Sequence, residues 1–222
     1  MNLNIEIREN LKQDLLNRTT TLGQQALLPT EKSELDGIVQ QLEALNPTPL
    51  PLTPENRSLL LGDWKLLYAS NGTVITRRLP GGIIIHAIWQ TLSAAGEAAL
   101  SATGNSEGIV ASNGAELELP LLGRVQLQAQ GHWQWQGKTQ TATVAFDAFS
   151  LQATGLFQQA HWELPALHIP VLEGLRREAA WQTSYLDLDL RIGRGATGNL
   201  FVFARSPLPS ISSQCHPGNT VI

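Results

Sequence analysis

The spacing of apolar residues changes once along the chain, from a helical period to the period of β-strands. Up to about residue 45, apolar side chains recur every three or four positions, which predicts two amphipathic helices over about residues 5–16 and 31–45. The proline-rich stretch NPTPLPLTP then ends the helical pattern and predicts a stiff connector. Residues 1–53 are therefore expected to form an N-terminal helical segment, and Pro54 is expected to begin one further short helical turn.

From Gly62 to about Arg205 the chain has the pattern of short strands separated by turn residues. The segment SYLDLDLRI is the most regular, because its apolar residues fall on even positions and its polar residues on odd ones, as in a half-buried strand. A glycine-rich break and the run LFVFA follow, which predicts an antiparallel hairpin. Residues 157–181 predict a long loop or an edge excursion. The expected strands span residues 64–70, 83–92, 107–112, 115–121, 124–136 and 139–152, with the closing hairpin at 184–205.

This pattern predicts a mainly β domain over residues 54–205, either a sandwich or an up-and-down barrel. The domain begins with Gly62-Asp63-Trp64, the Gly-x-Trp form found at the first strand of lipocalin-like barrels. In such a barrel the last strand returns beside the first, which would bring Arg205 close to Trp64. A guanidinium stacked on an indole is favourable by roughly 0.5–2 kcal/mol, and its planar fork also bonds backbone carbonyls. We therefore predict structural roles for Gly62, Trp64 and Arg205.

Alternation also predicts which side chains face the interior of such a barrel. Two sets of apolar residues, one on the first strand and one on the penultimate strand, are expected to line a cavity for a hydrophobic ligand. The alternative is that the two sets pack against each other and fill the barrel. Trp133 and Trp135 face either the interior or a membrane interface. The predicted ligand-binding residues of the wall are Trp64, Leu66 and Tyr68 on the first strand and Leu188, Leu190 and Ile192 on the penultimate strand.

Two arginines of the last hairpin are further candidates for ligand binding. Arg191 and Arg194 are expected to stand near the mouth of the barrel, where the anionic head group of a bound lipid would meet them. The alternative is that Arg191 pairs with Asp187 or Asp189 on the outer face, while Arg194 only decorates the turn.

Composition and charge mainly exclude classes of protein, such as nucleic-acid-binding and transmembrane proteins. The chain has 222 residues, 42% of them hydrophobic, and a formal net charge of −4, which provides no basic face for nucleic acid. No apolar run approaches the roughly 18–20 residues that span a bilayer, and the N-terminus has the pattern of neither a secretory signal nor a transit peptide. We therefore expect a protein that is neither secreted nor transmembrane. Its last residues, 206–222, are expected to form a disordered tail.

The sequence contains few of the residue patterns that indicate an enzyme. The five histidines are scattered, without the spacing of a local metal site, and no Gly-x-Ser-x-Gly motif is present. Asp187 and Asp189 lie beside Arg191, which favours their ionised form and argues against a general acid. The stretch GRGATG lacks the lysine and the following helix of a phosphate-binding loop. We expect no enzyme activity, no cofactor and no metal.

Three stretches of the chain resemble the plastid lipid-associated protein family, whose members are also called fibrillins or plastoglobulins. These stretches are LEALNPTPLP, LLLGDWKLLYAS and SYLDLDLRIGRGATGNLFVFAR. The resemblance implies a lipocalin-like antiparallel β-barrel preceded by two amphipathic helices. It also implies binding of a hydrophobic molecule such as a prenylquinone, a carotenoid or a fatty acid. The implied location is the thylakoid or the cytoplasm of a cyanobacterium, or the thylakoids and plastoglobules of a plastid.

Two functions follow from the resemblance and stay open at this point. The protein either holds or carries a hydrophobic molecule at thylakoid or lipid-globule surfaces, or it is a scaffold that coats lipid particles or recruits a lipid-biosynthetic enzyme. The carrier needs a dry pocket, whereas the scaffold needs exposed apolar surface. The N-terminal helices accordingly either cover the base of the barrel or dock a membrane or a partner protein.

Overall fold

The computed structural model describes residues 3–29, 34–73, 76–78, 82–96, 108–120, 123–135, 140–156, 167–170 and 179–206. Within these residues the helices are α1 (Leu3–Leu22), the 3-10 helix η1 (Gly23–Leu27), α2 (Glu34–Ala44), α3 (Pro54–Leu60) and the 3-10 helix η2 (Thr76–Arg78). The described strands are β1 (Gly62–Ala69), β2 (Ile84–Ala94), β3 (Ile109–Leu119), β4 (Gly123–Gln134), β5 (Thr141–Leu156), β6 (Leu167–Pro170), β7 (Ala179–Leu186), β8 (Leu190–Gly195) and β9 (Leu200–Arg205).

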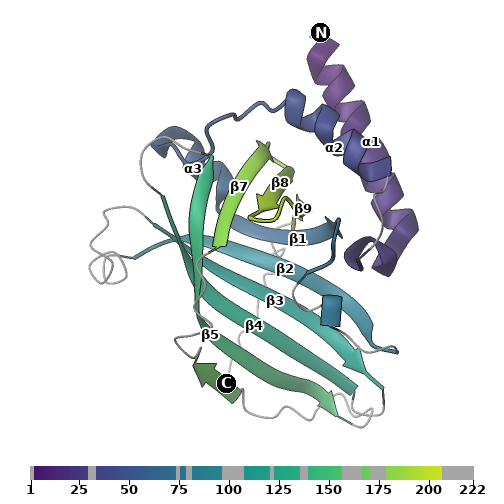
Figure 1. Ribbon diagram of the computed structural model, residues 1–222, viewed down its shortest axis with the longest axis vertical. Coiled ribbons are helices and arrows are strands. Elements are labelled where there is room, and N and C mark those ends of the chain that lie inside the picture. Colours follow the sequence, from purple (N-terminus) through teal and green to yellow (C-terminus); the bar gives the residue numbers. More distant parts are fainter. Residues whose placement is uncertain are drawn as a thin grey trace, which may run out of the picture.

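Eight of the described strands close into an antiparallel barrel, which the helices precede (Figure 1). The hydrogen-bonded order is β4-β3-β2-β1-β9-β8-β7-β5, and pairing of β4 with β5 completes the ring. β6 pairs with β5 beside this ring. The prediction of a mainly β, lipocalin-like barrel is therefore confirmed. Of the predicted excursion at 157–181, only β6 and the start of β7 are described, and residues 207–222 also lie outside the described residues.

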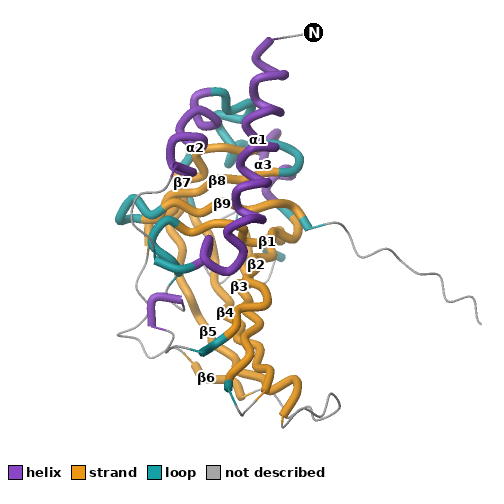
Figure 2. Tube along the Cα trace, turned by 90° about the vertical axis from the view of Figure 1, so that its right-hand side faces the viewer, coloured by secondary structure: helices purple, strands orange, loops and turns teal. Residues whose placement is uncertain are grey.

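Two apolar clusters hold the layers together. The first lies inside the barrel and includes Trp64, Leu92 and Trp133. The second lies between the helices and the outer face of the sheet around β8 and β9, where α1 and α2 pack (Figure 2). Helix α2 contributes buried side chains at the helical spacing that the sequence predicts, and this apolar stripe docks it onto the barrel. Those side chains are Leu35, Ile38, Val39 and Leu42.

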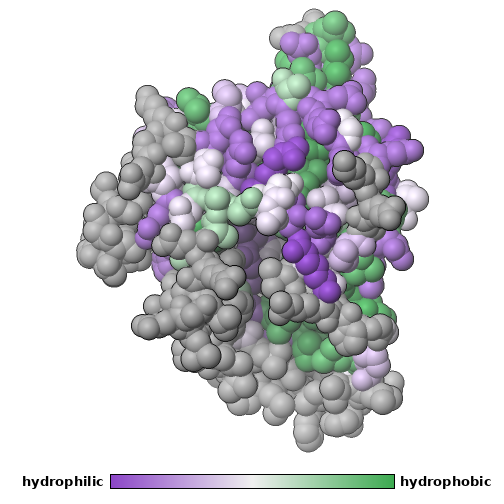
Figure 3. Space-filling model, viewed as in Figure 1, coloured by the Kyte–Doolittle hydropathy of each residue, from purple (hydrophilic) through white to green (hydrophobic). Residues whose placement is uncertain are grey.

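Helix α1 is longer than its apolar spacing predicts, since it continues to Leu22. The hydroxyls of Thr19 and Thr20 both donate to the carbonyl oxygen of Leu16, so this polar turn satisfies its own side chains within the helix. At the opposite end of α1, Leu3 is 68% exposed, and Figure 3 shows hydrophobic surface at this tip. No described helix is both long enough and apolar enough to cross a membrane.

The predicted strands 107–112 and 115–121 are a single strand, β3. The Asn113-Gly114 pair between them suggested a turn, but both residues serve the packing of a continuous strand. Asn113 accepts a hydrogen bond from Gln90 of β2, and a Cβ at Gly114 would collide with the Trp89 indole. Glycine is therefore present because the indole lies directly over the strand.

The predicted single strand over SYLDLDLRI is wrong, because the chain turns between Leu186 and Leu190. The carboxylate of Asp187 accepts hydrogen bonds from the backbone N–H groups of Asp189 and Leu190, which closes a tight turn. Leu186 pairs with Arg191 across this turn, so an even position faces an odd one. Residues that are directly opposite share a face of the sheet. The even-numbered residue before the turn, Leu186, therefore faces the interior, whereas the even-numbered residues after it, Leu190 and Ile192, face outward.

A bulge causes a second change of face, in β1. The register between β1 and β9 shifts between Leu66 and Tyr68. Leu66 therefore faces the barrel interior, whereas Tyr68 lies in the outer cluster, where its hydroxyl donates to Asp36 of α2 over 3.0 Å. The predicted common face of Trp64, Leu66 and Tyr68 is wrong for Tyr68.

Arg205 joins the base of the barrel to the segments around it. Its guanidinium carbon lies 4.2 Å from the centroid of the Trp64 ring, so the predicted stacking is present. Its three nitrogens donate to the backbone carbonyls of Leu59, Leu61 and Leu188. The Trp64 indole N–H donates to the carbonyl of Leu60. Side chains of the barrel thus satisfy carbonyls that the end of α3 leaves unpaired.

Gly62 makes room for this arrangement. Its φ is +121°, and a Cβ at this position would lie 2.7 Å from Nη1 of Arg205. Both observations exclude an ordinary side chain, since L-residues rarely adopt this φ and the guanidinium is held in place by carbonyls.

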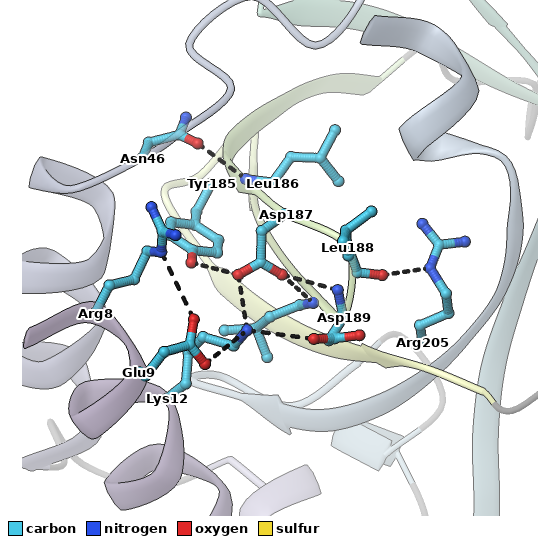
Figure 4. Close-up of polar contacts among 11 residues, drawn as sticks. Arg8, Glu9, Lys12, Asn46, Tyr185, Leu186, Asp187, Leu188, Asp189 and Arg205 are labelled. Atoms are coloured by element: carbon cyan, nitrogen blue, oxygen red, sulfur yellow. Dashed lines mark hydrogen bonds and ion pairs between the residues drawn. The ribbon is translucent and has the colours of Figure 1, made fainter. Parts of the chain in front are cut away.

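A polar cluster attaches α1 to the turn between β7 and β8 (Figure 4). The Lys12 ammonium lies 2.9 Å from a carboxylate oxygen of Asp187 and 3.5 Å from one of Asp189. The Tyr185 hydroxyl donates to the same oxygen of Asp187 over 2.6 Å. Lys12 and Tyr185 are both buried, so these contacts lie largely out of water, where they are stronger than on a surface.

Burial and hydrogen bonding act in opposite directions on the ionisable groups of this cluster. Burial by itself would raise the pKa of Asp187, but hydrogen bonds from Tyr185, Lys12 and the backbone lower it below its usual value. Burial would lower the pKa of Lys12, but the hydrogen bond to Asp187 and nearby carboxylates raise it. Burial and the Asp187 carboxylate together raise the pKa of Tyr185. The ionised pair and the neutral phenol are therefore the stable forms at neutral pH.

Replacing Gly62 by alanine is expected to destabilise the fold by about 2–3 kcal/mol, because the residue must adopt a strained φ and displace Arg205. Urea unfolding at pH 7 measures the change. Gly37→Ala is the matched control: Gly37 lies within α2 and a Cβ there meets nothing within 4 Å. This control should gain up to about 1 kcal/mol from helix propensity. Equal stabilities of the two variants would contradict this role of Gly62.

Asp187→Asn is expected to destabilise the protein by about 2 kcal/mol at pH 7, where the ionised carboxylate is fully stabilising. Because the folded pKa is depressed, this contribution is present above the ordinary pKa and disappears as pH falls through the folded pKa. The difference from wild type should therefore shrink as pH falls below the ordinary pKa of an aspartate, about 4, in urea unfolding experiments. Asp14→Asn, which removes an exposed partner of Arg18, should change stability by less than about 0.5 kcal/mol at either pH. A constant difference for Asp187→Asn would show that the carboxylate charge does not stabilise the fold.

Candidate functional site

Arg191 is a charged residue with no exposed surface. It lies on β8, directly opposite Phe203 of β9 and Leu186 of β7, and both of these residues belong to the core of the barrel. Directly opposite residues point to the same face of an antiparallel sheet. The guanidinium therefore lies inside the barrel, with an exposed fraction of 0%.

Three aromatic rings contact this guanidinium. Its central carbon lies 4.5 Å from the ring centroid of Phe203, 5.0 Å from that of Trp64 and 5.8 Å from that of Trp133. Each such contact is worth about 0.5–2 kcal/mol. The rings stabilise the charge, but they offset only part of the several kcal/mol that it costs to bury an ion.

A chain of hydrogen bonds runs from Arg191 to the neighbouring wall. Nη2 of Arg191 donates to Oε1 of Gln90 on β2 over 2.5 Å, and Nε2 of Gln90 donates to Oδ1 of Asn113 on β3 over 2.7 Å. Gln90 is neutral, so it accepts a hydrogen bond without compensating the charge. Among the described residues, no carboxylate forms an ion pair with Arg191.

Several buried polar atoms in this region lack a hydrogen-bond partner among the described residues. Within the described part of the chain, Nε and Nη1 of Arg191 have no acceptor, and the same is true of the indole Nε1 atoms of Trp133 and Trp181. The hydroxyl oxygen of Thr183 also has no partner among these residues, and Thr183 pairs in the sheet with Gly193, two positions beyond Arg191 on the same face of β8. The Trp181 indole lies across Gly193, where a Cβ would collide with it. Unsatisfied donors are thus concentrated on one part of the inner wall.

The charge of Arg191 persists at neutral pH. Burial lowers the pKa of Arg191 to about 9, and the nearby positive charge of Arg205 acts in the same direction. At pH 7 the guanidinium is still protonated, because its pKa remains above the pH. The site therefore presents a cation and neutral donors to whatever occupies it.

The wall next to this site is built from small side chains. On β3 and β4, Ala111 pairs with Gly131 and Asn113 pairs with Ala129, all on the inner face. Asn113 and Ala129 are only half-buried, as is Leu127 two positions from Ala129, although these side chains point into the barrel. This inner wall is therefore accessible at Asn113, Leu127 and Ala129, whereas Ala111 and Gly131 are buried.

The structure distributes the predicted wall residues over three places. Trp64 and Leu66 lie in the barrel interior. Leu190 and Ile192 pack in the outer cluster against the helices, because the turn before them changes the face of even positions. Leu188 lies in that turn and is 68% exposed. The predicted interior position is therefore wrong for Leu188, Leu190 and Ile192, as it is for Tyr68.

The two candidate arginines have opposite orientations. Arg191 points inward rather than pairing with Asp187 or Asp189 on the outer face. Arg194 lies on the outer face, where Nε and Nη2 bond the two carboxylate oxygens of Glu43 on α2 over 2.8 and 2.6 Å. This pair borders an open groove of about 440 Å³, lined mainly by polar side chains of α2, the connector after it, Gln140 before β5, and strands β7 and β8. Arg194 therefore does not point into the barrel, and it does more than decorate the turn, because it links β8 to α2.

Trp133 and Trp135, which were expected to face either the interior or a membrane interface, both lie at the barrel interior or its edge. Trp133 is buried in the interior, and Trp135 lies at its edge with the Arg57 guanidinium 5.7 Å from the ring centroid. Within the described part of the chain, no group of three or more His, Cys, Asp or Glu residues could hold a metal ion.

Sequence reasoning missed Gln90, Asn113 and Thr183 as members of the site. Asn113 was hidden in an apparent turn, and Gln90 and Thr183 each stand next to other polar residues, so no alternation marks them as inner residues. One usable signal was Asp187, since an aspartate side chain often closes a turn by accepting a hydrogen bond from the backbone N–H two residues on. Recognising that turn would have placed Arg191 inside the barrel.

Comparisons with known proteins agree with this architecture. The PAP_fibrillin family model matches residues 9–204. Probable plastid-lipid-associated protein 3, chloroplastic, from Arabidopsis thaliana is 29% identical over 203 residues, which cover 78% of this chain and 52% of that protein. Plastoglobulin-1, chloroplastic, from Pisum sativum is 28% identical over 227 residues, which cover 89% of this chain and 61% of that protein. No solved structure matches the chain significantly.

The chain spans between about half and three fifths of the length of these two relatives. The family match, in contrast, extends from α1 to β9 and includes the barrel and the helices packed on it. It covers Trp64, Gln90 and Arg191, which form the polar site inside the barrel. The protein belongs to the PAP_fibrillin family.

Proposed function

We propose that this protein binds and carries a small hydrophobic molecule, without catalysis, at thylakoid or lipid-globule surfaces. The candidate ligands are a prenylquinone, a carotenoid or a fatty acid. The observation that supports the proposal best is the inner face of β3 and β4, where Asn113, Leu127 and Ala129 remain half-buried inside a closed barrel. A wall that is mainly apolar, with a few polar groups on one side, is the usual character of a site for a small ligand.

The names of the relatives are consistent with this proposal. One is called a plastid-lipid-associated protein and the other a plastoglobulin, and both names carry the word chloroplastic. We extend lipid association from these proteins to this chain, and on the same basis we propose a location at a thylakoid or a lipid globule of a plastid. The thylakoid or cytoplasm of a cyanobacterium is the alternative location, which the names of these relatives do not address.

Mass spectrometry of organic extracts tests the carrier function. Protein purified under mild conditions from its native cells is expected to contain one prenylquinone, carotenoid or fatty acid at near-stoichiometric amount. Ala129→Phe should lose most of this lipid, because the added ring occupies the space beside Arg191. Gln130→Phe is the matched control, since Gln130 is the adjacent residue on the exposed outer face. Equal lipid contents in the two variants, or an empty wild-type protein that takes up no added lipid, would contradict the carrier function.

A scaffold that coats lipid particles or recruits a lipid-biosynthetic enzyme is the second candidate. It is favoured by the tip of α1, where Leu3, Ile5 and Ile7 are 68%, 45% and 40% exposed. Leu3 and Ile7 are four residues apart, so they are neighbours on one side of α1. The N-terminal end of α1 therefore presents exposed apolar side chains, whereas Leu15 further along the helix is buried against the barrel.

Substituting this tip separates the two functions better than deleting the helix, since deletion would uncover the outer apolar cluster. If the scaffold function holds, Leu3→Gln combined with Ile7→Gln should lower binding to galactolipid vesicles in flotation by about fivefold or more. The lipid content of the barrel should not change. Ile84→Gln, which removes an apolar side chain that is 48% exposed on β2, is the control. Unchanged flotation of the double variant would count against the scaffold function of α1.

A further inference from the structure

The proposed function leaves open which part of a lipid the polar site would hold. We propose that the ligand carries a carboxylate, and that Arg191 binds this carboxylate inside the barrel through its Nε–H and Nη1–H groups. The proposal rests on the carrier function and adds the chemistry of the ligand head group.

The first argument is the imbalance of charge. Arg191 is completely buried, its described contacts are aromatic rings and the neutral Gln90, and no described carboxylate pairs with it. A buried charge without a counter-ion is costly, and proteins usually pair such charges. An anionic ligand would supply the missing negative charge at the point where the cation is held.

The second argument is the type of the unpaired groups. Arginine and tryptophan side chains donate hydrogen bonds and cannot accept them. The unpaired nitrogens of Arg191, Trp133 and Trp181 therefore require acceptors from outside the described side chains. A carboxylate has two oxygens with about four acceptor positions, so it can serve several of these donors at once.

The third argument concerns the magnitude of the charge. Arg205, which contacts the same Trp64 ring as Arg191, already uses all three guanidinium nitrogens on backbone carbonyls. The site therefore offers one free positive charge, which a singly charged carboxylate balances. A phosphate dianion would leave excess negative charge, and a neutral carbonyl would leave the charge of Arg191 uncompensated.

The inner face of β3 and β4 suggests where the hydrocarbon part of the ligand would lie. Gln90 connects Arg191 to Asn113, and Asn113 lies beside Ala129 on the inner face of β3 and β4. Asn113, Leu127 and Ala129 of this face are incompletely buried, so an acyl chain that extends away from the guanidinium would lie against them. A long-chain carboxylic acid is the class of molecule that matches both parts of the site.

Binding of the fluorescent cis-parinaric acid and of its methyl ester to the delipidated full-length chain tests the proposal at pH 7. The two probes share one hydrocarbon chain, but only the acid carries a charge. Wild-type protein is expected to bind the acid about tenfold or more tightly than the ester. In Arg191→Gln the preference should fall to within about twofold of unity, through weaker binding of the acid and unchanged binding of the ester.

Two further variants exclude an effect on folding or on net charge. Arg124→Gln removes an arginine from the outer face of β4, where its side chain is 54% exposed, and should retain the wild-type preference. Arg191→Lys keeps the charge and should retain part of the preference even if Arg191→Gln does not fold. The assignment to Arg191 would be overturned if Arg191→Gln still preferred the acid over the ester, or if Arg124→Gln lost this preference to the same extent.

The wild-type measurement distinguishes failure of this inference from failure of the carrier function. Equal binding of acid and ester would overturn the carboxylate inference while supporting a barrel that holds neutral hydrophobic molecules. Absence of binding for both probes would contradict the carrier function for ligands of this size and would overturn the inference with it.

Discussion

The contacts of Arg205 are the interaction on which the closed barrel most depends. One guanidinium stacks on Trp64 at the start of β1 and bonds carbonyls from the end of α3 and from the turn between β7 and β8. It therefore joins the first strand, the last strand and the two segments that cover the base. Gly62 must lack a side chain for the guanidinium to fit, so the first and last residues of the barrel constrain each other.

The fixed base positions a second arginine inside the barrel. Both Arg205 and Arg191 contact the Trp64 ring, at 4.2 Å and 5.0 Å, and the turn that Arg205 holds through Leu188 determines which face of β8 points inward. The buried cation is thus a product of the same closure that stabilises the fold. The two arginines differ in their partners: Arg205 bonds backbone carbonyls, whereas two nitrogens of Arg191 have no acceptor among the described residues, which suits the binding role that we propose for it.

The sequence allowed prediction of the helices, of most strands, of the lipocalin-like closure and of the contact between Arg205 and Trp64. These features depend on local periodicity and on one topological rule. Interior positions were predicted wrongly after residue 186, because of a tight turn, and at Tyr68, because of a bulge, since each changes which residues face inward. Leu186 pairs with Arg191, an even position with an odd one, and the only signal of this change in the sequence is the turn-forming Asp187. Gln90 and Asn113 were missed because their hydrogen bonds join residues that are far apart in the sequence, and Thr183 was missed because only its pairing with Gly193 brings it to the site.

The two tyrosines of the chain, Tyr68 and Tyr185, have a common position that follows from the bulges in β1 and β7. Both bulges place a tyrosine on the outside of the barrel, and each hydroxyl bonds a carboxylate, Asp36 on α2 or Asp187 in the turn that binds α1. Tyrosine ultraviolet absorbance is sensitive to hydrogen bonding of the phenol and to its contact with water. The protein therefore contains an intrinsic spectroscopic reporter of helix docking that is distinct from the tryptophans of the barrel core, Trp64 and Trp133.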